Sequence, residues 1–163
     1  MKKSRKMLYI SVFVLSAVLL LLSAGCAQTG GGLQNSAGAY LRLHVRADSD
    51  GEVDQSVKLA VRDAVLEYLT PIATGCRDKE EMQNALSCRL AQIEMVADEV
   101  LRDNEMPYTS HAYLGHEYFP TRTYGDLTLA AGDYDALVVE LGSGKGANWW
   151  CVAFPPLCFV AGH

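Results

Sequence analysis

Residues 141–159 read LGSGKGANWWCVAFPPLCF, and this stretch constrains how the rest of the chain can fold. It holds both tryptophans of the chain, two of its five cysteines and two of its five prolines. It is too short and too interrupted to cross a bilayer, which needs about 20 consecutive apolar residues. Its aromatic part therefore either packs inside a domain or contacts a partner. The glycine-rich residues 142–146 predict a turn, and residues 149–153 predict a strand that enters the core.

The residues before this stretch predict further strands. Residues 134–141 (YDALVVEL) are strongly apolar, and residues 108–119 show aromatic and other β-favouring residues in alternation. The short segment 127–129 (LTL) is followed by an Ala-Gly-Asp turn. This spacing predicts a hairpin between 127–129 and 134–141. The turn at 142–146 predicts a second hairpin, in which the tryptophan-containing strand pairs with 134–141.

An earlier strand is predicted at residues 40–47 (YLRLHVRA). From position 41 to 46 its odd positions are apolar and its even positions are basic, which is the alternation of a strand with one buried face. The even positions include Arg42 and His44. Their face is either simply solvated or a binding surface.

Two amphipathic helices are predicted between these strands. Apolar residues recur every three or four positions over 52–69 and again over 79–104, and Pro71 marks the expected end of the first helix. Each helix is preceded by a capping pattern: Ser49 with Glu52, and Asp78 with Glu81. The order of elements predicts an α+β fold, with a mainly antiparallel sheet and two long amphipathic helices packed on one face.

Residues 1–26 predict an export signal, because four basic residues precede an apolar run from Met7 to Leu22. The segment ends in LSAGC, which is similar to a bacterial lipobox. Three outcomes stay open: cleavage and secretion, lipidation at Cys26, or an uncleaved anchor. Residues 27–39 are rich in Gly, Ser, Gln and Asn and predict a flexible linker. One folded domain is expected at 40–160, outside the cytoplasm, either secreted or membrane-anchored.

The charge of the chain excludes some partners. Four of the 14 basic residues lie in the first 26 positions and none of the 19 acidic residues do, so the remainder carries ten basic and 19 acidic residues, a net charge of −9. An acidic domain disfavours nucleic acid, whose binding depends on basic side chains. It also disfavours an anionic membrane surface. We therefore expect no nucleic-acid partner, and membrane contact only through the N-terminal segment.

No motif for catalysis, metal binding or cofactor binding is recognisable. The histidines lack H-E-x-x-H spacing, and His111 and His116 would lie on opposite faces of one strand. The acidic sequence at 48–52 lacks the ligand spacing of a calcium loop. Lys145 is followed by glycine, whereas a phosphate loop has serine or threonine there. We therefore expect no catalytic residue, no metal and no cofactor.

The cysteines permit a disulfide outside the cytoplasm, since four remain if Cys26 is removed or lipidated. Cys151 and Cys158 flank a Phe-Pro-Pro turn and meet if that turn folds back. The alternative is a pair of buried free thiols.

Three blocks of the sequence resemble one family, the stage II sporulation protein R family of endospore-forming bacteria. They read RLHVRADSD (42–50) with DQSVKLAVRDAVLEYL (54–69), YFPTRTYGDLTLAAGDYDAL (118–137), and GSGKGANWWCVAFPPLCF (142–159). The blocks follow the family's order and extend from position 42 to position 159.

The resemblance implies a function that the spacing of residues does not indicate. Family members are made in the forespore and exported into the space between the forespore and the mother cell. There they trigger a membrane-embedded aspartic protease, the sigma-E processing peptidase, which removes the pro-sequence of sigma-E. The resemblance therefore implies an exported signalling protein whose partner is this protease. The alternatives are an exported cell-envelope hydrolase, acting for example on peptidoglycan, and an envelope scaffold protein.

The face that contacts a partner is predicted from residue types, because aromatic and arginine residues dominate binding hot spots. Trp149 and Trp150 are neighbours on a predicted strand, so one faces the core and the other is available. The candidate contacts are Arg42, His44, Tyr118, Phe119, Arg122, Tyr124, Trp149 and Trp150.

Overall fold

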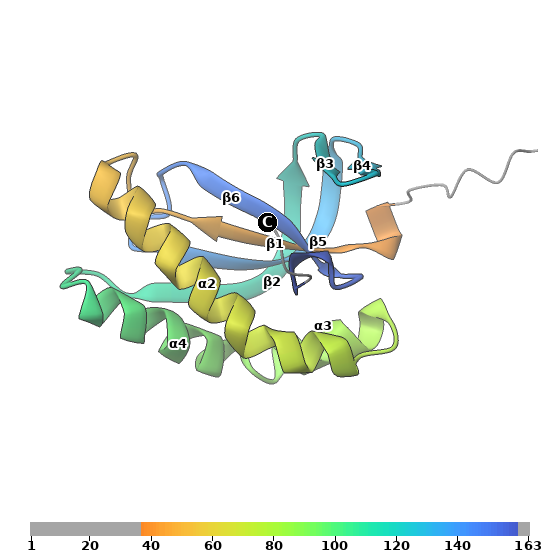
Figure 1. The fold of residues 1–163 in the computed structure, drawn as a ribbon, viewed down its shortest axis with the longest axis horizontal. Coiled ribbons are helices and arrows are strands. Elements are labelled where there is room, and N and C mark those ends of the chain that lie inside the picture. The colour runs from red at the N-terminus through yellow and green to blue at the C-terminus, as the bar shows by residue number, and fades with distance from the viewer. Residues whose placement is uncertain (1–36, 160–163) are drawn as a thin grey trace, which may run out of the picture. The chain divides into compact units, whose positions relative to one another are not determined.

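The structure is a computed structural model that describes residues 37–159 (Figure 1). The predicted export signal at 1–26, Cys26 and most of the predicted linker lie outside the described residues. The end of that linker forms a short 3-10 helix, η2 (Ala37–Ala39). A second one, η3 (Leu157–Phe159), follows the last strand. None of the helices within residues 37–159 is long and apolar enough to cross a membrane.

Four strands form the main sheet, in the order β2-β5-β1-β6. The central strand β1 (Leu41–Arg46) is parallel to β5 (Gly132–Leu141) and antiparallel to β6 (Asn148–Phe154). The strand β2 (Ser110–Phe119) is antiparallel to β5. A mainly antiparallel sheet is thus confirmed. The predicted hairpin between 134–141 and the tryptophan-containing strand is wrong, because β1 lies between β5 and β6.

The strands β3 (Arg122–Tyr124) and β4 (Leu127–Leu129) pair only with each other and form a separate two-stranded sheet. The predicted pairing of 127–129 with 134–141 is therefore wrong. Gly125 in the connecting turn has a φ of 56°, a left-handed conformation that glycine adopts at little cost and that tight hairpins require. A two-residue turn at this glycine pairs β4 with β3, its nearer neighbour in the sequence. The strand β5 therefore pairs with β2 and β1 instead.

The first long helix, α2 (Glu52–Gly75), continues past Pro71, so the predicted helix end is wrong. Pro71 removes one backbone N–H, but it lies in the last turns of the helix. Two hydroxyl groups bond to carbonyls around it: Thr70 donates to Leu66 O at 2.7 Å and Thr74 to Thr70 O at 3.0 Å. The apolar stripe continues as far as Ala73, which is buried.

The second predicted helix is two helices, α3 (Lys79–Ser87) and α4 (Leu90–Asp103). At the break, the N–H of Arg89 donates to Leu86 O at 2.8 Å, a bond spanning three residues that tightens the chain into a turn. The predicted cap of the first piece is confirmed, since the Asp78 carboxylate accepts the N–H of Glu81 at 2.8 Å.

The helices cover one face of the main sheet, which confirms the predicted α+β fold. Figure 1 shows α2 and α4 side by side across the sheet, with β3 and β4 away from both. Odd-numbered residues of β1 and β5 join the helices in one core cluster, with side chains that are almost fully buried. The largest members of this cluster are Leu41, Leu43, Leu69, Met82, Leu86, Ile93, Leu101, Leu137 and Leu141.

The opposite face of β1 is not solvated, so that part of the sequence prediction is wrong. Arg42 is 0% exposed and His44 is 3% exposed. A second cluster covers them, formed by Phe119, Tyr134 and neighbouring apolar residues of β5 and β6. A mainly antiparallel sheet can leave one face to water or cover both, and the alternation of a single strand does not reveal which occurs.

The glycine-rich residues 142–146 pass across the end of β1 to reach β6. The N–H of Ser143 donates to Asp48 Oδ1 at 2.6 Å, and the N–H of Ala147 donates to Asp50 Oδ1 at 2.6 Å. At Gly146 a Cβ atom would collide with the carbonyl of Ser49, so this close approach needs glycine. The acidic segment therefore binds this loop.

The predicted cap at Ser49 and Glu52 is wrong as a consequence. The N-cap of α2 is Gly51, which makes no side-chain capping bond. The hydroxyl of Ser49 instead donates to Asp54 and accepts the N–H of Gly51 at 3.1 Å.

Candidate functional site

The candidate site lies on the side of the main sheet that α2 and α4 leave uncovered, which we call the helix-free face. The even-numbered residues of β1, β5 and β6 and the odd-numbered residues of β2 point to this side, as the strand register requires. Residues of the β3–β4 hairpin lie over one end of it. The side chains that meet there form an arginine–aromatic cluster: Arg42, His44, Phe119, Arg122, Tyr124, Tyr134 and Trp150.

Arg42 is the centre of this cluster. Its guanidinium carbon lies 4.2 Å from the centroid of the Phe119 ring and 5.0 Å from that of Tyr134, within the range of cation–π attraction. Its Nε donates to Cys151 O at 2.9 Å, and its Nη2 donates to the hydroxyl of Tyr124 at 2.7 Å. Burial lowers the pKa of the Arg42 guanidinium, and the charge of Arg122 lowers it further.

His44 lies beside Arg42 and is held by ring contacts. Its ring stacks on Trp150 with centroids 5.6 Å apart and packs at a tilt on Phe119 at 5.5 Å. Burial, followed by the charge of Arg46, lowers the pKa of His44 to about 4. The imidazole is therefore neutral at pH 7. The side chain of Asn148 interacts with the imidazole and opposes this lowering, but neither ring nitrogen makes a hydrogen bond of good geometry within residues 37–159.

Trp150 and Arg122 form the accessible part of the cluster. The guanidinium of Arg122, an exposed residue, lies 4.3 Å from the Trp150 ring centroid. Trp150 is half-buried, and its indole N–H has no hydrogen-bond partner among the described residues. Tyr124 of the hairpin ties this end together, because its hydroxyl also contacts Trp150 O at 3.3 Å.

An ion-pair network borders the cluster farther along the sheet. The guanidinium of Arg46 contacts Glu117 and Glu140 at 2.5 Å each. The hydroxyl of Tyr113 donates to both carboxylates, and burial raises its pKa to about 12. These four residues come from the strands β1, β2 and β5, and the pairing of these strands brings them together.

The structure brings together six of the eight predicted contact residues in the arginine–aromatic cluster. The side chains of Arg42 and Phe119 are fully buried and that of His44 is nearly so, so the structure does not place these three on an open surface. Tyr118 is 64% exposed, but its position on β2 puts it on the other side of the sheet.

The two tryptophans face opposite sides, as their positions on one strand predict. Trp149 packs against the helix-side core and has the guanidinium of Arg62 at 5.4 Å from its ring centroid. Trp150 faces the helix-free side. The two rings point to opposite sides as expected, but both are half-buried, so neither is fully core and neither is fully open.

Sequence patterns missed two further groups, the Tyr134 ring over Arg42 and the Arg46 network. The alternation of β2 and β5 assigns Glu117 and Tyr134 to one face of each strand. To predict that this is the face of Arg42, the order of the strands in the sheet must also be known, and local patterns do not provide it.

Cys151 and Cys158 form a disulfide that joins β6 to η3. Cys76 and Cys88 are free thiols. No group of three or more metal-ligating residues that could hold a metal ion occurs in residues 37–159.

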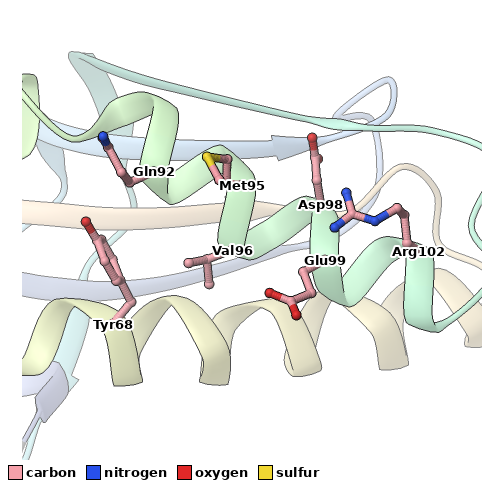
Figure 2. Close-up of a pocket in the computed structure, with 7 residues that line it drawn as sticks. All are labelled: Tyr68, Gln92, Met95, Val96, Asp98, Glu99 and Arg102. Atoms are coloured by element: carbon pink, nitrogen blue, oxygen red, sulfur yellow. The ribbon is translucent and has the colours of Figure 1, made fainter.

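A groove with a volume of about 380 Å³ lies between α2 and α4 (Figure 2). Tyr68 of α2 faces the side chains of α4 across it, and Met95, which lines it, is 68% exposed. Its rim is mixed in charge, with Asp98, Glu99 and Arg102. It lies on the side opposite to the arginine–aromatic cluster.

The fold and the cluster together define an α+β domain with an arginine–aromatic surface on the open side of its sheet. A family model described as "Stage II sporulation protein R" matches residues 37–163, and the chain belongs to this family. It is 37% identical over 120 residues to stage II sporulation protein R of Bacillus subtilis (strain 168), over 74% of this chain and 54% of that protein. The chain thus spans about half the length of this relative. No solved structure matches it.

Proposed function

We propose that the protein is an exported signalling protein of endospore formation, which activates a membrane-embedded aspartic protease and so triggers the processing of pro-sigma-E. The observation that carries the proposal is the family match, which spans the whole of the described domain. The family has a role in sporulation, and the Bacillus subtilis relative bears the family's name. In this proposal the chain is a ligand of the protease and not itself an enzyme.

The proposal includes a location. The protein is made in the forespore, and residues 1–26 direct it into the space between the forespore and the mother cell. It is secreted there or stays at the membrane through this segment, with Cys26 as a candidate lipidation site. The domain's net charge of −9 supports membrane contact through the N-terminal segment alone.

Activation by a ligand requires that the ligand bind the active state of the protease more tightly than the inactive state. The helix-free face is the part of the domain that fits this task best. Arg122 and Trp150 are of the residue types that carry most binding energy at interfaces, and they lie in contact with each other at its accessible end. The helix-side groove at Met95 is the competing surface.

Reconstitution tests the proposal. The full chain, the protease and the pro-sigma factor are produced together in a host that does not sporulate, and cleavage of the pro-sequence is followed on immunoblots. We expect cleavage only when all three are present. Cleavage that proceeds equally without the chain would reject the proposal.

Two variants in the same assay identify the contact surface. Trp150→Ala should reduce cleavage several-fold, and Met95→Ala, on the opposite side of the domain, should not. Export and the urea midpoint of each variant are measured beside the cleavage, so that lost folding is not mistaken for lost contact. The reverse result would assign the contact to the groove.

A further inference from the structure

Two arginines of the arginine–aromatic cluster have no counter-charge. Neither Arg42 nor Arg122 forms an ion pair within the described residues, and Arg42 is fully buried. The other buried cation, Lys58, also lacks an ion pair, but its ammonium donates to Gln55 Oε1 and to Ala147 O. All 19 acidic side chains of the chain lie within residues 37–159, so no other acidic side chain of this chain is left to supply one. A buried cation is normally paired, because burial removes its hydration. The missing negative charge therefore points to another molecule.

Unpaired polar atoms gather at the same place. Five buried side-chain nitrogen or oxygen atoms in residues 37–159 lack a hydrogen-bond partner, and all five belong to residues of the helix-free face: Arg42, His44, Asn148 and Trp150. Arg42 Nη1 and Trp150 Nε1 are donors in every protonation state. Since buried donors are almost always satisfied in folded proteins, these two call for an acceptor such as a carboxylate oxygen.

The β3–β4 hairpin controls access to these donors. It forms no strand ladder with the main sheet. Beside its turn, the Tyr124 hydroxyl accepts one N–H of Arg42. Arg122 pairs with Leu129 at the base of the hairpin, and its exposed side chain covers Trp150. Leu129, at the base, is fully buried and fixes the hairpin to the domain. A shift of the turn together with a rotation of the Arg122 side chain would therefore uncover the donors with Leu129 still buried.

We propose that the helix-free face binds an aspartate or glutamate side chain of a protein partner, which is held by Arg122 and Trp150 and reaches Arg42 when the tip of the hairpin lifts. In naming the partner's chemistry, this inference rests on the proposed function. The observations favour a protein carboxylate over the phosphates of a membrane surface. The domain carries a net charge of −9, and Glu117 and Glu140 border the cluster, so a flat and densely charged membrane surface is repelled, whereas carboxylates on a narrow, flexible peptide can reach the two arginines.

The test is direct binding by the full chain in non-ionic detergent, measured by isothermal titration. The probe is hexaglutamate with blocked ends, and the comparison probes are hexaglutamine, inorganic phosphate and anionic phospholipid vesicles. We expect saturable binding of hexaglutamate only. Arg122→Gln should weaken it about tenfold, which is the usual scale for one charge-assisted contact. Tyr124→Phe should strengthen it, since the variant frees a donor of Arg42.

Arg62→Gln is the matched control, because Arg62 lies over Trp149 on the opposite face of the same strand. It should leave hexaglutamate binding unchanged. Equal binding by the Arg122→Gln variant and the parent chain would overturn the inference, as would equal binding of hexaglutamine or preferred binding of phosphate or vesicles. No protease is present, so this result is independent of reconstitution. Hexaglutamate binding without pro-sigma processing would reject the proposed function alone.

Discussion

The hydroxyl of Tyr124 accepts a hydrogen bond of 2.7 Å from Arg42 Nη2, which joins the tip of the β3–β4 hairpin to the central strand across 82 positions of sequence. The hairpin has no strand pairing with the main sheet, and this bond links the two through side chains, as does the contact of the same hydroxyl with Trp150 O. It also keeps a fully buried guanidinium partly satisfied.

Replacing Tyr124 with phenylalanine removes this link and keeps the ring. We expect the free energy of unfolding to fall by about 1–2 kcal/mol, since a bond to a charged group is lost and its donor stays buried. Urea denaturation measures the change. Tyr118→Phe, at an exposed position, serves as control and should have almost no effect. Equal midpoints for the two variants would show that the bond does not stabilise the fold.

The two tryptophans should respond differently to truncation. Trp149→Ala removes half-buried packing against the helix-side core, and we expect a loss of about 2 kcal/mol in stability. Trp150→Ala should lower pro-sigma processing more than its own loss of stability explains. Thermal unfolding and the reconstitution assay measure both properties for both variants. If Trp149→Ala alone removed activation while keeping its stability, the contact would lie on the helix side.

The disulfide between Cys151 and Cys158 should stabilise the end of the domain. The loop it closes is short, and the chain-entropy model gives about 2 kcal/mol for such a loop. The double variant Cys151→Ala/Cys158→Ala should therefore unfold at a lower temperature, and reductant should lower the midpoint of the parent chain only. Alkylation followed by mass measurement gives an independent check. Labelling of both thiols in the unreduced, unfolded chain would contradict the bond.

His44 should make stability depend on pH. Its pKa is about 4 in the folded chain and 6.5 as the ordinary value, so the unfolded chain binds more protons between these pH values. The contribution is fully present above pH 6.5 and is lost as the pH falls to 4. At about 1.4 kcal/mol per pKa unit, the loss reaches roughly 3 kcal/mol.

His44→Phe keeps the stacked ring and removes the titration. Because neither ring nitrogen makes a hydrogen bond of good geometry among the described residues, the variant should match or exceed the parent at pH 7. Urea midpoints between pH 4 and 7 should fall less steeply for this variant. The exposed residue His116, changed to glutamine, is the control. Parallel slopes for His44→Phe and the parent would refute the assignment.

The outer edge of β2 is protected by two carboxylates of α4. Glu94 accepts the N–H of Ala112 at 2.8 Å, and Asp98 accepts that of Ser110 at 2.6 Å. Unpaired edge donors invite pairing with a second chain. The double variant Glu94→Ala/Asp98→Ala should therefore self-associate, as measured by light scattering after size exclusion. A variant that stays as monodisperse as the parent would show that the edge needs no such cover.

The fold class followed from local patterns. The periodicity of 52–69 and 79–104 predicted helices, the alternation in 40–47 placed Arg42 and His44 together on one face, and adjacency placed the two tryptophans on opposite faces. These inferences succeeded because the period of an element depends only on its own residues. The contact role of the eight predicted residues remains a prediction.

Only the tertiary structure decided which strands are neighbours. Placing β1 between β5 and β6 buried Arg42 on a face that could have been solvated. It also brought Asp48 to the loop at Ser143, 95 positions away, whose N–H its carboxylate accepts. Strand order depends on the packing energy of the whole sheet and on contacts between distant residues, which no local period encodes. The sequence by itself determined the elements and their faces, and long-range packing decided that two uncompensated arginines meet aromatic rings on the open side of the sheet.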